Sequence, residues 1–181
     1  MVDVLFGDAE PGGRLAESIP FHIGQVAADR NFPGHPRQVQ YREGLYVGYR
    51  FHDSAGVPAR FPFGHGLGYT TWSLGALRVR GEGTARTATL TVTNTGARSG
   101  TTVVQLYLRA VASVLPRPDR ELAGFARLQL EAGETTQLDV VLEPRVFALW
   151  DSTAGRWVVA GGQYELLAGT SSVEIHDRVM I

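Results

Sequence analysis

The 181-residue sequence predicts a mainly β fold, in which an antiparallel β-sandwich of immunoglobulin-like type follows a long, extended and mostly irregular N-terminal segment. Two observations support this prediction. From about Leu74 onward, the chain is a series of short segments of alternating apolar and polar residues, separated by turn residues. About seven such segments fit into roughly 100 residues, which is the spacing typical of a sandwich. Residues 1–73 show no such period and are instead rich in Gly, Pro and aromatic residues.

The predicted strands follow one another in a regular order. ARTATLTVTNTG, residues 85–96, places Ala88, Leu90 and Val92 on one face and threonines on the other, and it ends in an Asn-Thr-Gly turn. In TTVVQLYLRA, residues 101–110, Val104, Leu106 and Leu108 alternate with Val103, Gln105 and Tyr107. The other predicted strands are ELAGFARLQL, TTQLDVVLEP, RVFALWD, GRWVVAGG and QYELLAGTS.

Turns and large aromatic residues complete the predicted sandwich. LEAGETTQL reads as an edge turn in which Gly133 supplies the backbone freedom and Glu131 and Glu134 keep the surface polar. No helix is expected in this part beyond RVFAL. We expect Trp150, Trp157 and Tyr164 to close one end of the core.

Composition excludes several classes of function. The net charge is -1 and the seventeen basic residues, all arginine, are scattered, so neither nucleic acid nor an anionic membrane is an expected partner. The absence of cysteine excludes disulfides, a thiolate zinc site and a cysteine nucleophile. The start MVDVLFGDAEPGG is neither a signal peptide nor a membrane span, so the chain as written is expected in the cytoplasm, although an intact parent could be secreted.

The N-terminal segment is too aromatic for a disordered linker and too long for an ordinary loop. We therefore expect extended chain that buries its rings individually against a larger body, only part of which is the sandwich. The stretch RFPFGHGLGYTTW shows this pattern most clearly, since it sets Phe61, Phe63, Tyr69 and Trp72 among glycines.

Four motifs carry a family resemblance: DVLFGDAEPGGRLAESIP, YREGLYVGYRFHD, FPFGHGLGYTTW and RPDRELAGFARLQLEAGET. In this order they resemble the C-terminal region of glycoside hydrolase family 3, the β-glucosidase type. The resemblance implies that residues 1–73 are the remnant of an α/β-sandwich domain with an extended linker, and that residues 74–181 are a fibronectin type III-like domain. It also implies that the four aromatic side chains of RFPFGHGLGYTTW anchor the junction. One departure is Gly68, where the family usually has serine.

The resemblance also implies missing partners, because the family places a (β/α)8 barrel and most of the α/β-sandwich domain first. Both catalytic carboxylates would fall before Met1, and retaining hydrolysis needs two carboxyl groups about 5 Å apart. The chain is thus expected to be the C-terminal portion of an enzyme that hydrolyses terminal β-glycosidic bonds, with a structural role and no activity alone. No catalytic, cofactor-binding or metal-binding residue is assigned to it. The alternative is a free-standing fibronectin type III-like module for protein interaction or carbohydrate binding.

Several acidic and histidine residues are candidates for a substitute active site. Glu43, Asp53 and His52 are candidates for an acid/base pair. We expect instead that Glu43 pairs with an arginine such as Arg42 or Arg50, and that Asp53, with Ser54 and Gly56, forms a turn. The histidines His22, His35, His65 and His176 lack the spacing of a metal site.

Other motifs are weaker still. GDAEPGG, residues 7–13, lacks the lysine of a phosphate loop, and Ser171 and Ser172 lack a nucleophile motif. The segment Arg117 to Arg120 is expected to dock on the missing domains. Tyr107, Trp150 and Trp157 would stack on sugars only if they point outward. Near the N-terminus, VDVLFG reads as a helix end whose Val4, Leu5 and Phe6 have lost their packing partners.

Overall fold

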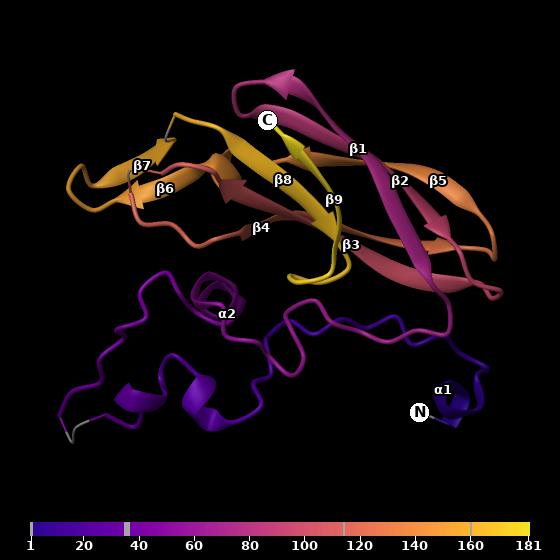
Figure 1. The fold of residues 1–181 in the computed structure, drawn as a ribbon, viewed down its shortest axis with the longest axis horizontal. Helices are drawn as coiled ribbons and strands as arrows, with labels where there is room; N and C mark the ends of the chain where they lie inside the picture. The colour runs from indigo at the N-terminus through magenta and orange to yellow at the C-terminus, as the bar shows by residue number, and fades with distance from the viewer. Residues whose placement is uncertain (1, 35–36, 114, 160) are drawn as a thin grey trace.

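The computed structural model describes residues 2–34, 37–113, 115–159 and 161–181. It has a β-sandwich above a thinner layer formed by the N-terminal segment (Figure 1). That layer contains α1 (Val2–Phe6), the short 3-10 helices η1 (Ile23–Gln25) and η2 (Asp29–Asn31), and α2 (Tyr49–Ala55). The strands are β1 (Trp72–Glu82), β2 (Ala85–Asn94), β3 (Gly100–Ala110), β4 (Glu121–Leu130), β5 (Thr135–Leu142), β6 (Ala148–Asp151), β7 (Arg156–Val159), β8 (Tyr164–Gly169) and β9 (Ile175–Met180).

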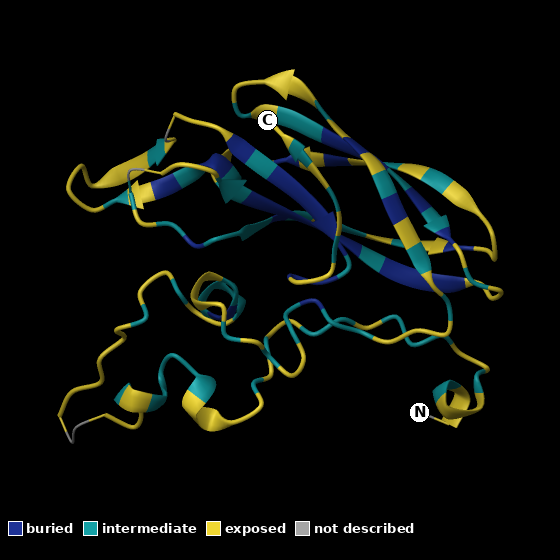
Figure 2. Cartoon of the chain, in the orientation of Figure 1, coloured by how far each residue is buried: buried dark blue, intermediate teal, exposed yellow. Residues whose placement is uncertain are grey.

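Two antiparallel sheets form the sandwich. One has three strands in the order β1-β2-β5, and the other has four in the order β4-β3-β8-β9. Their facing sides bury the core, which includes the predicted inward residues Ala88, Leu90 and Val92 of β2. Figure 2 shows this buried band between the sheets. The predicted antiparallel sandwich with an irregular N-terminal segment is therefore confirmed.

Strand β3 is buried on both faces. Val104, Leu106 and Leu108 point into the sandwich core, as their alternation predicts. Gln105 and Tyr107, on the opposite face, are also buried, because the N-terminal segment covers that side of the four-stranded sheet. This outer face is where the two layers of the molecule meet.

Two strands, β1 and β9, were not singled out by sequence. The alternation of β1 is interrupted by a bulge between Gly75 and Arg78, where Ala76 has φ 52°. The freed N–H of Leu77 donates a 2.8 Å hydrogen bond to the Asp177 carboxylate of β9. The bulge breaks the alternation of apolar and polar residues that would have predicted β1 from the sequence. Its hydrogen bond to Asp177 links the edges of the two sheets.

A separate hairpin, formed by β6 and β7, projects from the sandwich (Figure 1). The prediction that Trp150 and Trp157 close the core is wrong, since their exposed fractions are 50% and 48%. Tyr164 does close it, with its ring 5.5 Å from that of Phe147 in an edge-to-face contact. The helical stretch expected at RVFAL is a 3-10 turn, η3 (Pro144–Phe147), that leads directly into β6.

The N-terminal segment has two parts that differ in their contacts. We call residues 9–19 and 57–71 the strap, because these two extended stretches run together beneath the sandwich (Figure 1). Ile19 and Phe61 exchange backbone hydrogen bonds of 2.8 and 3.1 Å, and Leu15 N–H donates to His65 O at 2.8 Å. Residues 20–34 and 37–47 form the lobe, which carries η1 and η2 and projects away from the strap.

Candidate domain interface

Glycines allow the strap to approach the sandwich closely. Gly64 has φ 81°, and a Cβ atom there would lie 2.0 Å from Gln105 Oε1. Gln105 Nε2 donates to Gly64 O at 3.2 Å, and Ser172 N–H donates to Phe63 O at 2.9 Å. Only glycine provides both the backbone angle and the space at this position.

The four aromatic residues at the predicted junction anchor the strap to this chain. Phe63 stacks on Tyr49 of α2 at 4.6 Å, and Phe61 forms the bridge to Ile19. The Tyr69 hydroxyl donates to Val4 O, while Trp72 begins β1 and packs against the sandwich core. These contacts join the strap to α1, α2 and the sandwich.

Gly68, the departure from the family pattern, lies beside Glu10. The Tyr69 N–H donates to both Glu10 carboxylate oxygens, at 3.0 and 3.1 Å. A Cβ atom at Gly68 would lie 2.6 Å from Glu10 Oε1. A serine could therefore be accommodated only if the Glu10 side chain moved.

Helix α2 is seated on the outer face of the four-stranded sheet. The Tyr49 hydroxyl accepts a 2.8 Å hydrogen bond from Leu122 N–H, and its ring lies 6.0 Å from that of Tyr107. Ser54 Oγ accepts from Asp119 N–H at 2.9 Å. Gly56, with φ 63°, ends the helix. Asp53 therefore lies within a helix, and the prediction that it forms a turn is wrong.

A network of charged side chains lies at the α2 junction. The Asp53 side chain is 5% exposed, and Arg120 Nε lies 4.0 Å from its carboxylate. Burial raises the pKa of Asp53 to about 6, and the charge of Arg120 opposes this shift. Arg109 spans two more carboxylates, Asp119 at 2.8 Å and Glu165 at 3.1 Å. Hydrogen bonding to Arg109 and Arg120 lowers the pKa of Asp119 against the opposing effect of burial.

The arginines of the segment 117–120 are engaged within this chain. Arg117 donates to Val146 O at 2.6 Å and to the Glu121 carboxylate. Arg120 donates to Ser172 O at 2.7 Å and to Asp119 at 2.9 Å. These contacts hold the sandwich loops and α2 in place, and docking of this segment on other domains stays a prediction.

The candidate acid/base and metal residues do not assemble into a site. His52 Nδ1 lies 2.9 Å from Val57 O, its hydrogen-bond partner. Arg50 pairs with Glu121 at 3.8 Å, and Arg42 donates to Gln40, so the predicted pairing of Glu43 with either arginine is wrong. Within the described ranges no three His, Asp or Glu side chains are grouped to hold a metal. His35 lies outside the described residues.

The exposed apolar side chains of the N-terminal layer are concentrated in the lobe and α1, and Leu67 of the strap is also exposed, at 74%. None of the residues of α1 is buried, as expected for Val4, Leu5 and Phe6. Phe32, at the lobe, has an exposed fraction of 77%. The other large exposed apolar residues here are Val2, Phe21, Ile23, Val39, Tyr41, Leu45 and Val47. Among the residues that the structure describes, the lobe makes no hydrogen bond to the sandwich.

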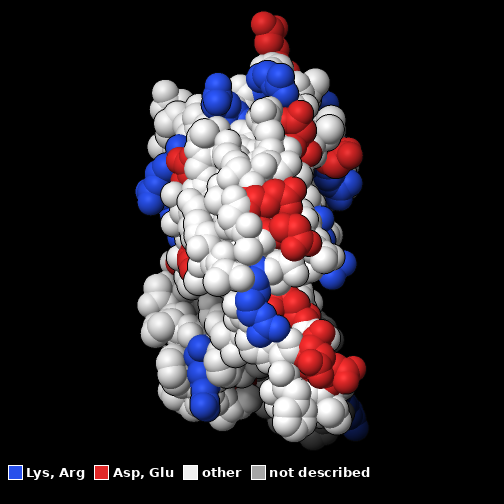
Figure 3. All heavy atoms as spheres, turned by 90° about the vertical axis from the view of Figure 1, so that its right-hand side faces the viewer, with Lys and Arg blue, Asp and Glu red and all other residues white. Residues whose placement is uncertain are grey.

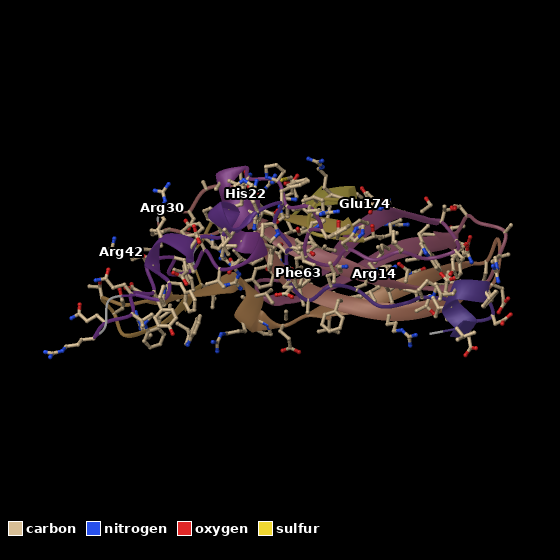
Figure 4. All side chains as sticks on the ribbon, turned by 90° about the horizontal axis from the view of Figure 1, so that it is seen from below. Arg14, His22, Arg30, Arg42, Phe63 and Glu174 are labelled. Atoms are coloured by element: carbon tan, nitrogen blue, oxygen red, sulfur yellow. The ribbon has the colours of Figure 1, made fainter. Side chains whose placement is uncertain are left out.

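Charged side chains extend from the lobe and from the end of the molecule near α1 (Figure 3 and Figure 4). In the view from below, Arg30 and Arg42 extend outward from the lobe, whereas Phe63 lies over the middle of the sandwich (Figure 4). At the end of the molecule shown in Figure 3, acidic and basic side chains are interspersed. No helix in the described part of the chain is long and apolar enough to cross a membrane.

Comparisons with known proteins agree with this architecture. Residues 102–172 match the fibronectin type III-like domain family. The chain is 37% identical to the thermostable beta-glucosidase B of Acetivibrio thermocellus, over 97% of this chain and 24% of that protein. It is 38% identical to an exo-alpha-(1->6)-L-arabinopyranosidase of Bifidobacterium breve, over 100% of this chain and 24% of that protein.

A solved structure gives the same result. The GH3 beta-glucosidase of Bifidobacterium adolescentis superposes with a TM-score of 0.96 at 36% identity, over 99% of this chain and 27% of that one. The chain thus spans about a quarter of the length of the relatives it matches. By sequence and by fold, this chain is homologous to the C-terminal, fibronectin type III-like region of glycoside hydrolase family 3 enzymes of the β-glucosidase type.

Proposed function

We propose that this chain is the C-terminal portion of a β-glucosidase-type glycoside hydrolase, in which it supports the catalytic domains and has no activity alone. The observation that carries the proposal is the apolar surface of α1 and the lobe, together with relatives about four times as long as this chain. In the proposed enzyme that surface packs on the (β/α)8 barrel and the α/β-sandwich domain.

The energetics of the exposed surface favour a covering partner. Leu5, Phe6 and Phe32 are largely exposed, and fully burying one such side chain is worth roughly 1.5–3 kcal/mol. A five-residue helix such as α1 is too short to be stable without packing. A domain seated against α1 and the lobe would supply that packing.

The carboxylates at the α2 junction support the expectation of inactivity. Asp119, Glu121 and Glu165 each lie within ion-pairing distance of an arginine of this chain. Retaining hydrolysis needs one carboxylate free to attack the sugar and a second carboxyl group to protonate the leaving oxygen. Carboxylates held by arginine are poorly suited to both tasks, so we assign the chemistry to the upstream domains.

The proposal also concerns the choice of sugar. The two relatives compared above are named for different sugars, yet each is 37–38% identical to this chain. We therefore assign the choice of sugar to the upstream domains.

A free-standing interaction module, the alternative function, would be expected to cover its own apolar residues. The exposed lobe therefore favours the supporting role.

Enzyme assays test the proposal directly. The purified chain should not hydrolyse an aryl β-glucoside, and it should bind the polypeptide encoded immediately upstream. Hydrolysis should appear, or rise, in the mixture of the two. Turnover by the chain alone, or failure of the two polypeptides to associate, would contradict the proposed function.

A further inference from the structure

A groove lies between the β6–β7 hairpin and the N-terminal segment, and Leu45 is the one described residue that it shares with the apolar lobe surface of the proposed function. It has a volume of about 300 Å³. One wall is formed by Trp150 and Trp157, which are direct cross-strand partners with ring centroids 5.6 Å apart. Leu45 of the lobe also lines the groove, and Arg50 and Glu121 supply polar groups. The groove thus combines two half-exposed indoles with charged side chains of both signs.

The tryptophans are held in place although they are exposed. Leu149, next to Trp150 on β6, is buried and anchors the strand. Arg145 lies over the Trp157 ring, with its Cζ atom 3.5 Å from the ring centroid, and this cation–π contact restrains the indole. A restrained aromatic wall loses little conformational entropy when a ligand binds.

The polar groups of the groove retain hydrogen-bonding capacity. Glu121 uses one carboxylate oxygen to accept from Arg117, while its other oxygen lies 3.8 Å from Arg50, beyond hydrogen-bond distance. In the described part of the chain, neither the Arg50 nor the Arg145 guanidinium makes a hydrogen bond. Two donor groups and one acceptor oxygen therefore border the indole wall.

This combination selects among ligand classes. An anionic ligand would suit the arginines but would be repelled by Glu121. An apolar peptide would cover the indoles but would desolvate the charged groups without replacing their hydrogen bonds, at about 1–3 kcal/mol for each group. A pyranose ring meets both requirements, because its C–H face packs on indole and its hydroxyl groups both donate and accept.

We propose that the groove between Trp150, Trp157 and Leu45 binds a pyranose unit of a neutral oligosaccharide. Trp150 and Trp157 form the stacking wall, and Glu121, Arg50 and Arg145 bind the hydroxyl groups. The proposal rests on this groove alone and not on the proposed enzyme function.

Tryptophan NMR signals provide the test and an internal control. The sequence has three tryptophans, and Trp72 lies at the start of β1 outside the groove. Titration of the full chain with cellohexaose should shift the indole N–H signals of Trp150 and Trp157 saturably and leave that of Trp72 in place. Unmoved Trp150 and Trp157 signals, or equal shifts of all three, would overturn the proposal.

Matched variants give a second measurement by calorimetry. Trp150→Ala and Trp157→Ala should each weaken cellohexaose binding at least tenfold. Phe125→Ala removes an aromatic residue that is 65% exposed on β4 and does not line the groove, and it should leave the affinity unchanged. Binding that survives both tryptophan substitutions would overturn the proposal. The proposal would also be overturned if the indole N–H signals of Trp150 and Trp157 stayed in place with cellohexaose but shifted on adding the upstream polypeptide. The groove would then be a protein contact.

Discussion

Gly64 and Gln105 are in such close contact that no side chain can be accommodated between them. The Gln105 side chain of β3 faces the strap, donates to Gly64 O, and also donates to Thr170 O at 2.7 Å. Its Oε1 accepts a 2.6 Å hydrogen bond from the Tyr107 hydroxyl. A buried polar side chain with all of these partners fixes the distance between the strap and β3.

The first prediction follows from this contact. Gly64→Ala should lower the free energy of unfolding by about 1–3 kcal/mol, because it combines a strained positive φ with displacement of Gln105. Urea denaturation measures the loss. Gly83→Ala is the matched control, since Gly83 also has a positive φ, 58°, but has open space around it. Equal losses in the two variants would show that backbone strain alone matters at Gly64.

The alternating segments were enough to predict the sandwich, because the period of two in β2 records which face is buried. The same period was not enough for β3. There the second face is covered by residues more than 40 positions away in sequence, as the contact of Gly64 with Gln105 shows. The sequence of a short alternating segment does not predict which distant residues cover its outer face.

The candidate interface was predicted less well, for related reasons. Aromatic residues without a period indicate burial but not the partner, so the strap and the lobe could not be separated by sequence. Helix α2 has only seven residues, too few for a helical period to stand out. Trp150 and Trp157 were misplaced because alternation in a two-stranded hairpin defines two faces but does not tell which one meets the core.

The second prediction concerns pH and Asp53. Its pKa is about 6 in the folded chain, above its usual value of 3.8, so folding favours the protonated carboxyl. The stability contributed by the neutral form is fully present below pH 3.8 and is lost as the pH rises through 6. Asp53→Asn should therefore be more stable than the wild type at pH 7.5, by about 1–3 kcal/mol, and the advantage should shrink toward pH 4.

Urea denaturation of both proteins at each pH measures this difference. The other charged groups near Asp53 are Arg120, Asp119 and His52. These groups are present in both proteins, so their contribution is reduced in the difference between the two free energies of unfolding at the same pH. Asp139→Asn, at an exposed carboxylate that pairs with Arg80, is the control and should show no such trend. An advantage of the Asp53 variant that grows as the pH falls would contradict the assigned sign.

The third prediction concerns the bulge of β1. Asp177→Ala removes the acceptor for the N–H of the buried residue Leu77, and an unpaired buried donor costs about 1–3 kcal/mol. Thermal denaturation should show a lower melting temperature. The control is Asp151→Ala, because Asp151 also accepts from backbone N–H groups, at 2.9 and 3.0 Å, but in an exposed turn. A melting temperature lowered as much by Asp151→Ala as by Asp177→Ala would argue against a special role for the bulge.

The fourth prediction separates the strap from the lobe by amide hydrogen exchange in the isolated chain. The amides of Leu15, Ile19 and Gly64 donate to backbone carbonyls across the strap, and this layer is pinned by Gln105. They should exchange slowly, within about tenfold of the slowest sandwich strands, because opening them requires release of the strap from β3. In the described residues of the lobe, the backbone N–H groups that donate to backbone carbonyls do so to residues close in sequence, as in the 2.9 Å bond from Val26 N–H to Ile23 O, and these amides should exchange far faster. If domains that precede this chain pack on the lobe as proposed, adding them should slow exchange in the lobe and leave the three strap amides unchanged, since these are already hydrogen-bonded within the strap. If the strap exchanged as fast as the lobe in the isolated chain, the sandwich alone would be the stable unit, and the contacts of the strap with β3 would not hold it in place.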